Sequence, residues 1–255
     1  TGSGTSTNMN VNEVISNISR KKYKTLVHPN DDVNLCQSSN DVIPSAINIS
    51  AARLVHNNLL PAMIRLSKAI NKKSKELKGI VKTGRTHLMD AMPITFEQEL
   101  LSWKCQIDED IMNVKTSLNN IKKIPVGGTA IGSGINAHKN FSKEFIKSLN
   151  SNNDFRFYLK SNKFTGISFQ NDSTALSSSI KLSSITLTKI SNDLRLMNSG
   201  PLSGLGEISL IALQPGSSIM PGKVNPVIPE SVLMACTKIL GNDLSINIAA
   251  SSGSF

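Results

Sequence analysis

The feature that most constrains the fold is a run of apolar side chains at helical spacing between residues 96 and 121. Successive members are four, three, four, four, three, four and three residues apart. This spacing places all of them along one narrow face of an α-helix, as in helical bundles. The face consists of Phe96, Leu100, Trp103, Ile107, Ile111, Val114, Leu118 and Ile121. We therefore expect a long helix that packs along its whole length.

The ends of this helix are marked in the sequence. Thr95 is followed three residues later by Gln98, the pattern of a capping box at a helix N-terminus. Pro125 lies beyond the other end and is incompatible with a helix interior. The expected helix is about 27 residues long.

Residues 44 to 78 form a second expected helix, with apolar residues again at helical spacing. Pro44 suits the first helical position, Pro61 is expected to kink the helix, and Gly79 suits the position after its end. Further helices are expected at residues 141–149, at 171–198, and from Pro229 past Leu244.

A glycine-rich connector at residues 127–134 separates the helices on its two sides, and no convincing strand alternation is present. The predicted fold class is all-α, a bundle of long helices. Long helices with apolar seams rarely bury these seams within one chain, so we expect other subunits to complete the bundle.

The charge of the chain does not indicate nucleic-acid binding. Lys and Arg number 28 against 18 Asp and Glu, a net charge of +10, but the basic residues are dispersed. One Trp and two Tyr offer few platforms for base stacking. A basic surface also attracts small dianions.

The three cysteines, Cys36, Cys105 and Cys236, are far apart and form no CxxC pair. We therefore expect neither a disulfide framework nor a metal site. No apolar run is long enough to span a membrane. The chain begins and ends inside apparent structural elements, so we expect it to be a fragment of a longer protein.

Four polar clusters interrupt the helices. They are residues 2–10, residues 28–31 with 37–41, residues 84–87, and residues 216–226 with Glu230. Taken singly, each has an ordinary explanation: hydroxyls and Asp before a helix are usually caps, and Lys223 alone would be a surface lysine. His56 and His138 lie outside these clusters and are interpreted as structural.

The fourth cluster, Gly-Ser-Ser-Ile-Met-Pro-Gly-Lys-Val-Asn-Pro, is the most informative for function. Gly216 permits a mobile backbone, two hydroxyls follow it, and Lys223 and Asn225 lie just beyond. Such a segment can close over a carboxylate and offer it several hydrogen-bond donors.

This segment resembles the loop motif of the fumarase/aspartase superfamily, and its amino-acid sequence is most similar to that of the class II fumarases. The other three clusters resemble further motifs of the same family, in the same order along the chain. The resemblance implies a central domain of long helices in a homotetramer, with each active site formed by three subunits. It also implies a small dicarboxylate substrate, fumarate or malate, with no metal, cofactor, nucleic acid or membrane involved.

By resemblance, Ser217 is the base that removes a proton from carbon, and Lys223 stabilises the charge that develops. His87 donates a proton or positions water, and Glu230 orients His87. The residues implied to bind substrate are Ser3, Gly4, Thr5, Ser38, Ser39, Asn40, Thr86, Ser218, Lys223, Val224 and Asn225. A secondary carboxylate site is implied at His28, Pro29, Asn30 and Asp31.

Two alternatives stay open from the sequence. Aspartase shares the fold and loop, but typically has Gln in place of His87 and Ala in place of Gly222. A non-catalytic helical scaffold would have no need of Ser217, Lys223 and Glu230. Residues 1–255 are expected to be the central helical catalytic domain, without the family's N-terminal domain and the end of its bundle. The expected location is the cytoplasm, with the mitochondrial matrix as an alternative.

Overall fold

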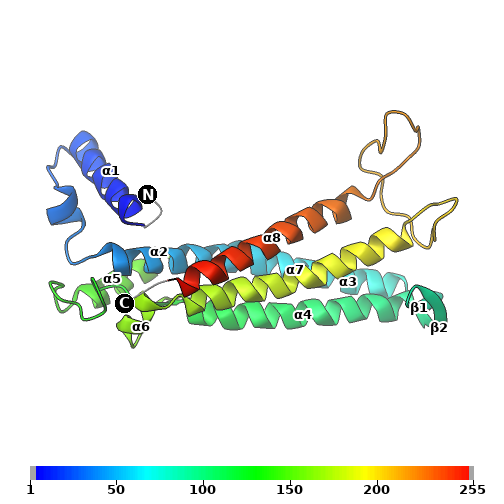
Figure 1. Ribbon diagram of the computed structural model, residues 1–255, viewed down its shortest axis with the longest axis horizontal. Helices are drawn as coiled ribbons and strands as arrows, with labels where there is room; N and C mark the ends of the chain where they lie inside the picture. The colour runs from blue at the N-terminus through cyan, green and yellow to red at the C-terminus, as the bar shows by residue number, and fades with distance from the viewer. Residues whose placement is uncertain (1–3, 253–255) are drawn as a thin grey trace. The chain divides into compact units, whose positions relative to one another are not determined.

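The computed structural model describes residues 4–252, and the chain is predominantly α-helical, as predicted (Figure 1). The α-helices are α1 (Thr5–Tyr23), α2 (Ser39–Leu54), α3 (Leu60–Glu76), α4 (Phe96–Ile121), α5 (Phe141–Ser151), α6 (Lys163–Ser168), α7 (Asn171–Met197) and α8 (Val227–Ser251). Two π-helical segments are η1 (Pro29–Val33) and η2 (Val55–Leu59). The strands are β1 (Val81–Thr86), β2 (Met89–Thr95), β3 (Lys123–Ile124) and β4 (Tyr158–Leu159).

These residues divide into two compact units. The first contains residues 4–59, 116–176 and 248–252, and the second contains residues 60–115 and 177–247. In the first unit, β3 and β4 form a short parallel pair. In the second, β1 and β2 form an antiparallel hairpin that joins α3 to α4.

Helix α4 forms as the apolar spacing predicts. The Thr95 hydroxyl accepts a hydrogen bond from the Gln98 N–H at 3.1 Å, and the Gln98 side chain accepts one from the Thr95 N–H at 2.8 Å. This capping box satisfies two N–H groups at the start of the helix. The seam is buried from Leu100 through Ile121, so its side chains form the core along α4.

The predicted start of the second helix is wrong by five residues. Helix α2 begins at Ser39, and Pro44 lies inside it. The reason is a capping box in which Ser38 and Asp41 satisfy the first N–H groups of the helix, which places its start before the proline.

The expected irregularity at Pro61 takes the form of a π-helical segment. Because Pro61 has no N–H, the chain cannot complete the regular hydrogen-bond ladder there. The segment η2 ends two residues before Pro61, and α3 then continues to Glu76. Gly79 follows with a left-handed backbone (φ 78°), close to its predicted place after the helix.

Several elements were not expected from the sequence, among them α1, the β1–β2 hairpin, α6 and the short strands β3 and β4. Helix α1 was not predicted because its buried side chains are polar, Asn8 and Asn12, whereas several apolar side chains of α1 are exposed. The Asn8 and Asn12 amides both donate to the Asn34 side chain at 3.1 Å, and this bonding replaces an apolar core. The hairpin was not predicted because β2 is almost entirely exposed and lacks apolar alternation.

Helices α5, α7 and α8 agree with their expected ranges within about two residues, the usual uncertainty of a helix end. The connector at residues 127–134 is a series of turns, as its glycines predict. His56 packs against Phe155 with ring centroids 4.5 Å apart, which supports its structural interpretation. The three cysteines are free. No helix in the described part of the chain is long and apolar enough to cross a membrane.

Candidate active site

His87 lies at the tip of the β1–β2 hairpin, in a tight turn. Thr86 pairs with Met89, and the two residues between them, His87 and Leu88, have φ values of 56° and 63°. Two consecutive left-handed residues define a type I′ turn, which normally selects Asn-Gly. A bulky side chain is uncommon in this conformation, and such strain gathers at functional sites. The turn therefore displays the exposed His87 at a cost in backbone energy.

The strain at this turn leads to a stability prediction. Leu88→Gly is expected to raise the Tm by stabilising the fold by about 1 kcal/mol, because glycine adopts the left-handed conformation without a Cβ clash. Thermal unfolding of Leu202→Gly is the matched control, since Leu202 is also exposed but has an ordinary φ. A Tm for Leu88→Gly that is no higher than that of the wild type would contradict the claim that the backbone is strained at Leu88.

A network of partly buried charges holds strand β1 of the same hairpin. Arg85 donates two hydrogen bonds to the Glu207 carboxylate, at 2.7 and 3.0 Å. Lys82, whose side chain is only 6% exposed, binds Glu99 at 2.7 Å and lies 3.5 Å from Glu207. The hydrogen bonds from Arg85 lower the pKa of Glu207, and those to Glu207 raise the pKa of Arg85. The network therefore ties β1 to the segment that follows α7.

The segment from Gly216 to Asn225 forms a closed loop. The Gly216 N–H donates to the Lys223 carbonyl at 2.9 Å, and the Asn225 amide donates to the Gly216 carbonyl at 3.0 Å. A Cβ on Gly216 would lie 2.3 Å from the Lys223 carbonyl oxygen, so only glycine permits this approach. Asn225, a predicted substrate ligand, thus also fixes the shape of the loop.

Ser217 occupies a distinct position in this loop. Its Oγ accepts hydrogen bonds from the backbone N–H groups of Ile219 at 3.2 Å and Met220 at 3.3 Å. Two N–H dipoles directed at one hydroxyl oxygen stabilise negative charge on that oxygen. The side chain is half-buried, whereas Ser218, Lys223 and Val224 are exposed around it. The loop therefore presents a half-buried hydroxyl oxygen that accepts two backbone N–H groups.

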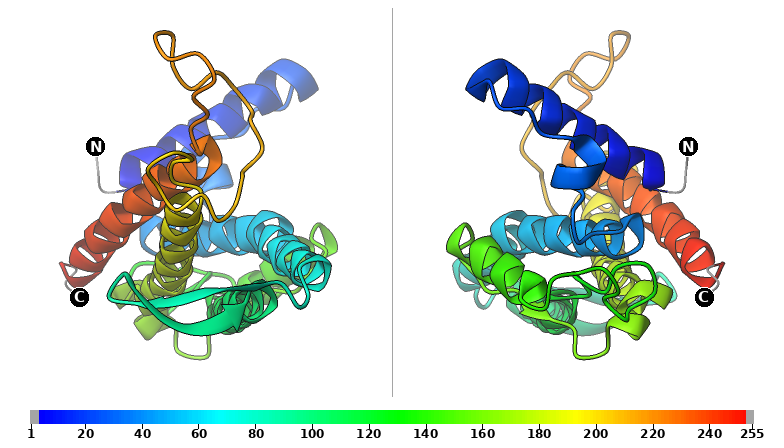
Figure 2. Two further views of the ribbon diagram at one scale, coloured as in Figure 1. Left: turned by 90° about the vertical axis from the view of Figure 1, so that its right-hand side faces the viewer. Right: turned by 90° about the vertical axis from the view of Figure 1, so that its left-hand side faces the viewer.

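The predicted catalytic residues of the second unit do not all meet within one chain. The hairpin and the segment between α7 and α8 lie at the same end of the long helices (Figures 1 and 2), and the Arg85–Glu207 pair joins them. Glu230 lies in the first turn of α8. Among residues 4–252, no hydrogen bond or ion pair joins His87 to Glu230 or to Ser217.

The predicted substrate-binding residues of the first unit gather at the start of α2. Ser38 is the N-cap of this helix, Ser39 and Asn40 are its first residues, and the Ser39 hydroxyl accepts a hydrogen bond from Asn8 at 3.1 Å. Gly4 precedes α1 with a φ of 81°, and Thr5 begins that helix. Ser3 lies outside the described residues.

The predicted secondary carboxylate site, residues 28–31, forms the start of η1. Its N–H groups are used within the turn: the Asp31 N–H donates to His28 Nδ1 at 3.1 Å, and the His28 N–H donates to Asp32 at 2.7 Å. The Asp31 carboxylate lies 3.2 Å from His28 Nδ1. The turn is exposed and contains two carboxylates.

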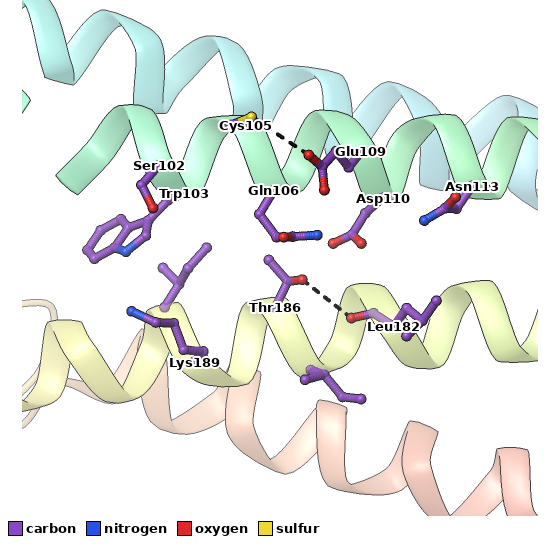
Figure 3. A pocket seen from close by; sticks show the side chains of 12 residues that line it. Ser102, Trp103, Cys105, Gln106, Glu109, Asp110, Asn113, Leu182, Thr186 and Lys189 are labelled. Carbon is purple, nitrogen blue, oxygen red and sulfur yellow. Dashed lines mark hydrogen bonds between the residues drawn. The ribbon is translucent and has the colours of Figure 1, made fainter. Parts of the chain in front are cut away.

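A separate groove of about 630 Å³ lies between α4 and α7 in the second unit (Figure 3). No predicted site residue lines it. Its wall includes Trp103, whose buried indole N–H has no partner in the described residues, and Asp110, whose burial raises its pKa. No group of His, Cys, Asp and Glu side chains suited to a metal ion occurs within residues 4–252.

Comparison with known proteins assigns the chain to a family. A family model described as lyase matches residues 1–241. The chain belongs to the lyase family. This assignment confirms the resemblance inferred from the four polar clusters.

Relatives within the lyase family are named as fumarate hydratases. The class II fumarate hydratase of Xylella fastidiosa strain 9a5c is 51% identical over 255 residues, which are 100% of this chain and 54% of that protein. One class II fumarate hydratase of Pseudomonas aeruginosa is 49% identical over 100% of this chain and 56% of its own length. The chain thus spans about half the length of these curated relatives.

Solved structures of lyase-family proteins share the fold. The class II fumarase of Schistosoma mansoni has a TM-score of 0.94 and 39% identity, over 99% of this chain and 57% of that chain. A fumarate lyase:delta crystallin structure from Brucella melitensis, bound to cobalt, has a TM-score of 0.91 and 43% identity, over 99% and 56%. The predicted all-α bundle of the fumarase/aspartase type is therefore confirmed.

Three residues of structural importance, Arg85, Glu207 and Asp41, were given no role in the sequence-based prediction. The first two pair across 122 positions, and the Asp41 carboxylate binds N–H groups of the distant connector. The available signal was a charged residue next to predicted site residues: Asp41 follows Asn40, and Arg85 precedes Thr86. The partners of these charges lie too far along the chain to be identified from the sequence.

Proposed function

We propose that this chain forms the helical catalytic core of a fumarate hydratase, which interconverts fumarate and (S)-malate. The observation that carries the proposal is the pair of N–H groups directed at Ser217 Oγ. A serine is a poor base unless its alkoxide is stabilised, and these two donors supply that stabilisation. The names of the relatives in the lyase family support the same reaction and do not favour aspartase.

In the direction from malate, the Ser217 alkoxide removes a proton from the carbon next to a carboxylate. The electron pair left on that carbon moves into the carboxylate and forms an aci-carboxylate. Lys223 and Asn225 stabilise its second negative charge. When the electrons return to form the carbon–carbon double bond, the hydroxyl group leaves with a proton as water.

His87 supplies that proton or positions the water that does so, and Glu230 raises the basicity of His87 by binding its other nitrogen. Thr86 binds substrate beside it. The remaining carboxylate oxygens of the substrate are held by hydroxyl, amide and N–H groups of Gly4, Thr5, Ser38, Ser39, Asn40, Ser218 and Val224, together with Ser3. Residues 28–31 are proposed as a secondary carboxylate site.

We further propose that residues 1–255 belong to one central domain and that active sites form only in a homotetramer. Within a single chain no hydrogen bond or ion pair among the described residues joins His87 to Ser217, as expected if each active site takes these two residues from different subunits. Apolar side chains that a single chain leaves exposed support this assembly. They include Val11, Val14, Ile15 and Ile18 of α1 and Met234, Leu240, Leu244 and Ile248 of α8.

The test combines ultraviolet absorbance with the mass of the assembly. The longest form of the protein that assembles is offered (S)-malate and, separately, L-aspartate. We expect fumarate to accumulate from malate alone, and only in fractions with the mass of a tetramer. Fumarate from aspartate alone, or none from a verified tetramer, would contradict the proposal.

A further inference from the structure

We infer that Asp41 is a positioning residue of the substrate site, which holds the connector of residues 127–134 against residues 38–40 so that both form one wall of that site. The inference rests on the proposed function, because it is this function that makes residues 38–40 ligands of the substrate. No residue of the connector was among the predicted site residues.

The Asp41 carboxylate joins two segments that are far apart in the sequence. It is completely buried. One of its oxygens accepts a hydrogen bond from the Ser38 N–H at 2.9 Å and so fixes the start of α2. The other accepts hydrogen bonds from the N–H groups of Gly127 at 2.8 Å and Thr129 at 3.0 Å. A single side chain thus sets the position of the connector relative to the Ser38 cap.

A second contact links the same two segments. The Asn40 amide donates a hydrogen bond to the Ala130 carbonyl at 2.8 Å. Asn40 is exposed, and Ala130 follows the two connector residues whose N–H groups Asp41 binds. The connector therefore lies directly beside a predicted substrate ligand and limits the orientations of the Asn40 side chain.

The backbone of the connector is held in an unfavourable conformation at the point where Asp41 binds it. Thr129, a β-branched residue, has a φ of 56° and is buried. This conformation is a genuine outlier for such a side chain. Charge-assisted hydrogen bonds to Asp41 offset its cost. Strain that the surroundings impose in this way occurs typically at ligand sites.

The other side of the connector is held by a lysine. The Lys163 ammonium donates to the Gly127 carbonyl at 3.3 Å and to the Ser142 hydroxyl at 2.7 Å. No ion pair with Asp41 is present in the described residues, so its carboxylate is satisfied by N–H groups. Burial raises the pKa of Asp41, and its three N–H partners counter that rise. The carboxylate thus acts as an acceptor for fixed backbone groups.

Asp41→Asn tests this role because it keeps the shape of the side chain but replaces one acceptor oxygen with a donor. The NH₂ of the new amide cannot accept a hydrogen bond from a backbone N–H group. Depending on which oxygen it replaces, the bond to Ser38 or the bonds to Gly127 and Thr129 would be lost. We expect the KM for fumarate to rise about tenfold, with kcat changed less than about threefold, because Asp41 does not touch the reacting atoms. Amide hydrogen exchange at Gly127 and Thr129 should become faster.

Ser45→Ala is the matched control. Ser45 is also buried in α2, and its hydroxyl donates to the Asp41 carbonyl at 2.6 Å, but among the described residues it makes no hydrogen bond to the connector. It should lower the Tm without changing the KM. An unchanged KM in Asp41→Asn, or an equal rise in both variants, would overturn the inference.

The two proposals can fail separately. A wild-type tetramer that does not hydrate fumarate would overturn the proposed function. In that case amide exchange still decides whether Asp41 holds the connector, because exchange at Gly127 and Thr129 is measured without substrate. Unaltered exchange in Asp41→Asn would refute the positioning role even in an active enzyme.

Discussion

Ser217→Ala is expected to lower kcat for the conversion of malate to fumarate by about 10²–10⁴-fold, the usual contribution of a general base. The substitution removes the oxygen toward which the Ile219 and Met220 N–H groups point, but leaves the loop closed by the bond between Gly216 and Lys223. The Tm should therefore change little. Steady-state kinetics and thermal unfolding of the same preparation measure both quantities.

Ser209→Ala provides the control for this loss. Ser209 is an exposed serine in the same inter-helix segment, and its hydroxyl makes no hydrogen bond in the described structure. Its kcat should equal that of the wild type. If Ser217→Ala retained more than about a tenth of the wild-type kcat, Ser217 could not be the base.

Glu207→Gln should have the largest effect on stability. It leaves Arg85 and the buried Lys82 facing a neutral amide, and we expect a loss of about 3 kcal/mol, as for other buried ion pairs that lose one partner. Chemical denaturation measures the loss. Glu144→Gln is the control, because its pair with Lys147 is exposed and long at 3.8 Å. It should change stability little.

The effect of Glu207→Gln should depend on pH in a defined direction. Hydrogen bonds from Arg85 lower the pKa of Glu207 below its ordinary value of 4.5. The stability that the ionised carboxylate contributes is therefore complete above pH 4.5 and is lost as the pH falls through the lowered pKa. The difference in the free energy of unfolding between wild type and variant should be constant near neutral pH and should decrease in acid. A difference that grows in acid would contradict this account of the network.

The long helices could be predicted because their signals are local. The seam of α4 repeats over seven intervals, and Thr95 and Gln98 identify its start. The start of α2 was placed incorrectly because two local signals compete. Pro44 favours a helix start at its own position, whereas Ser38 and Asp41 complete a capping box earlier in the chain.

Helix α1 and the hairpin were missed because neither follows the expected apolar pattern. Helix α1 buries asparagines and exposes apolar residues, which suits a surface covered by another subunit. The hairpin has a turn, His87–Leu88, that lacks the usual Asn-Gly signal. Both departures involve segments that the proposed function uses.

The candidate site residues are predictions from the sequence, and their arrangement in space could not be predicted from it. The sequence provides no sign that two N–H groups point at Ser217 or that Arg85 pairs with Glu207. Such relations depend on loop geometry and on contacts between distant segments.

The most direct test of the central claim is a complementation measurement with two inactive variants. Ser217→Ala and His87→Asn chains are purified separately, unfolded, mixed in equal amounts and reassembled, and fumarate formation from (S)-malate is then recorded. If each site takes Ser217 and His87 from different chains, about a quarter of the sites in mixed tetramers regain both residues. Activity should return to that fraction of the wild type. No recovery in tetramers shown by mass to contain both variants would contradict the shared site.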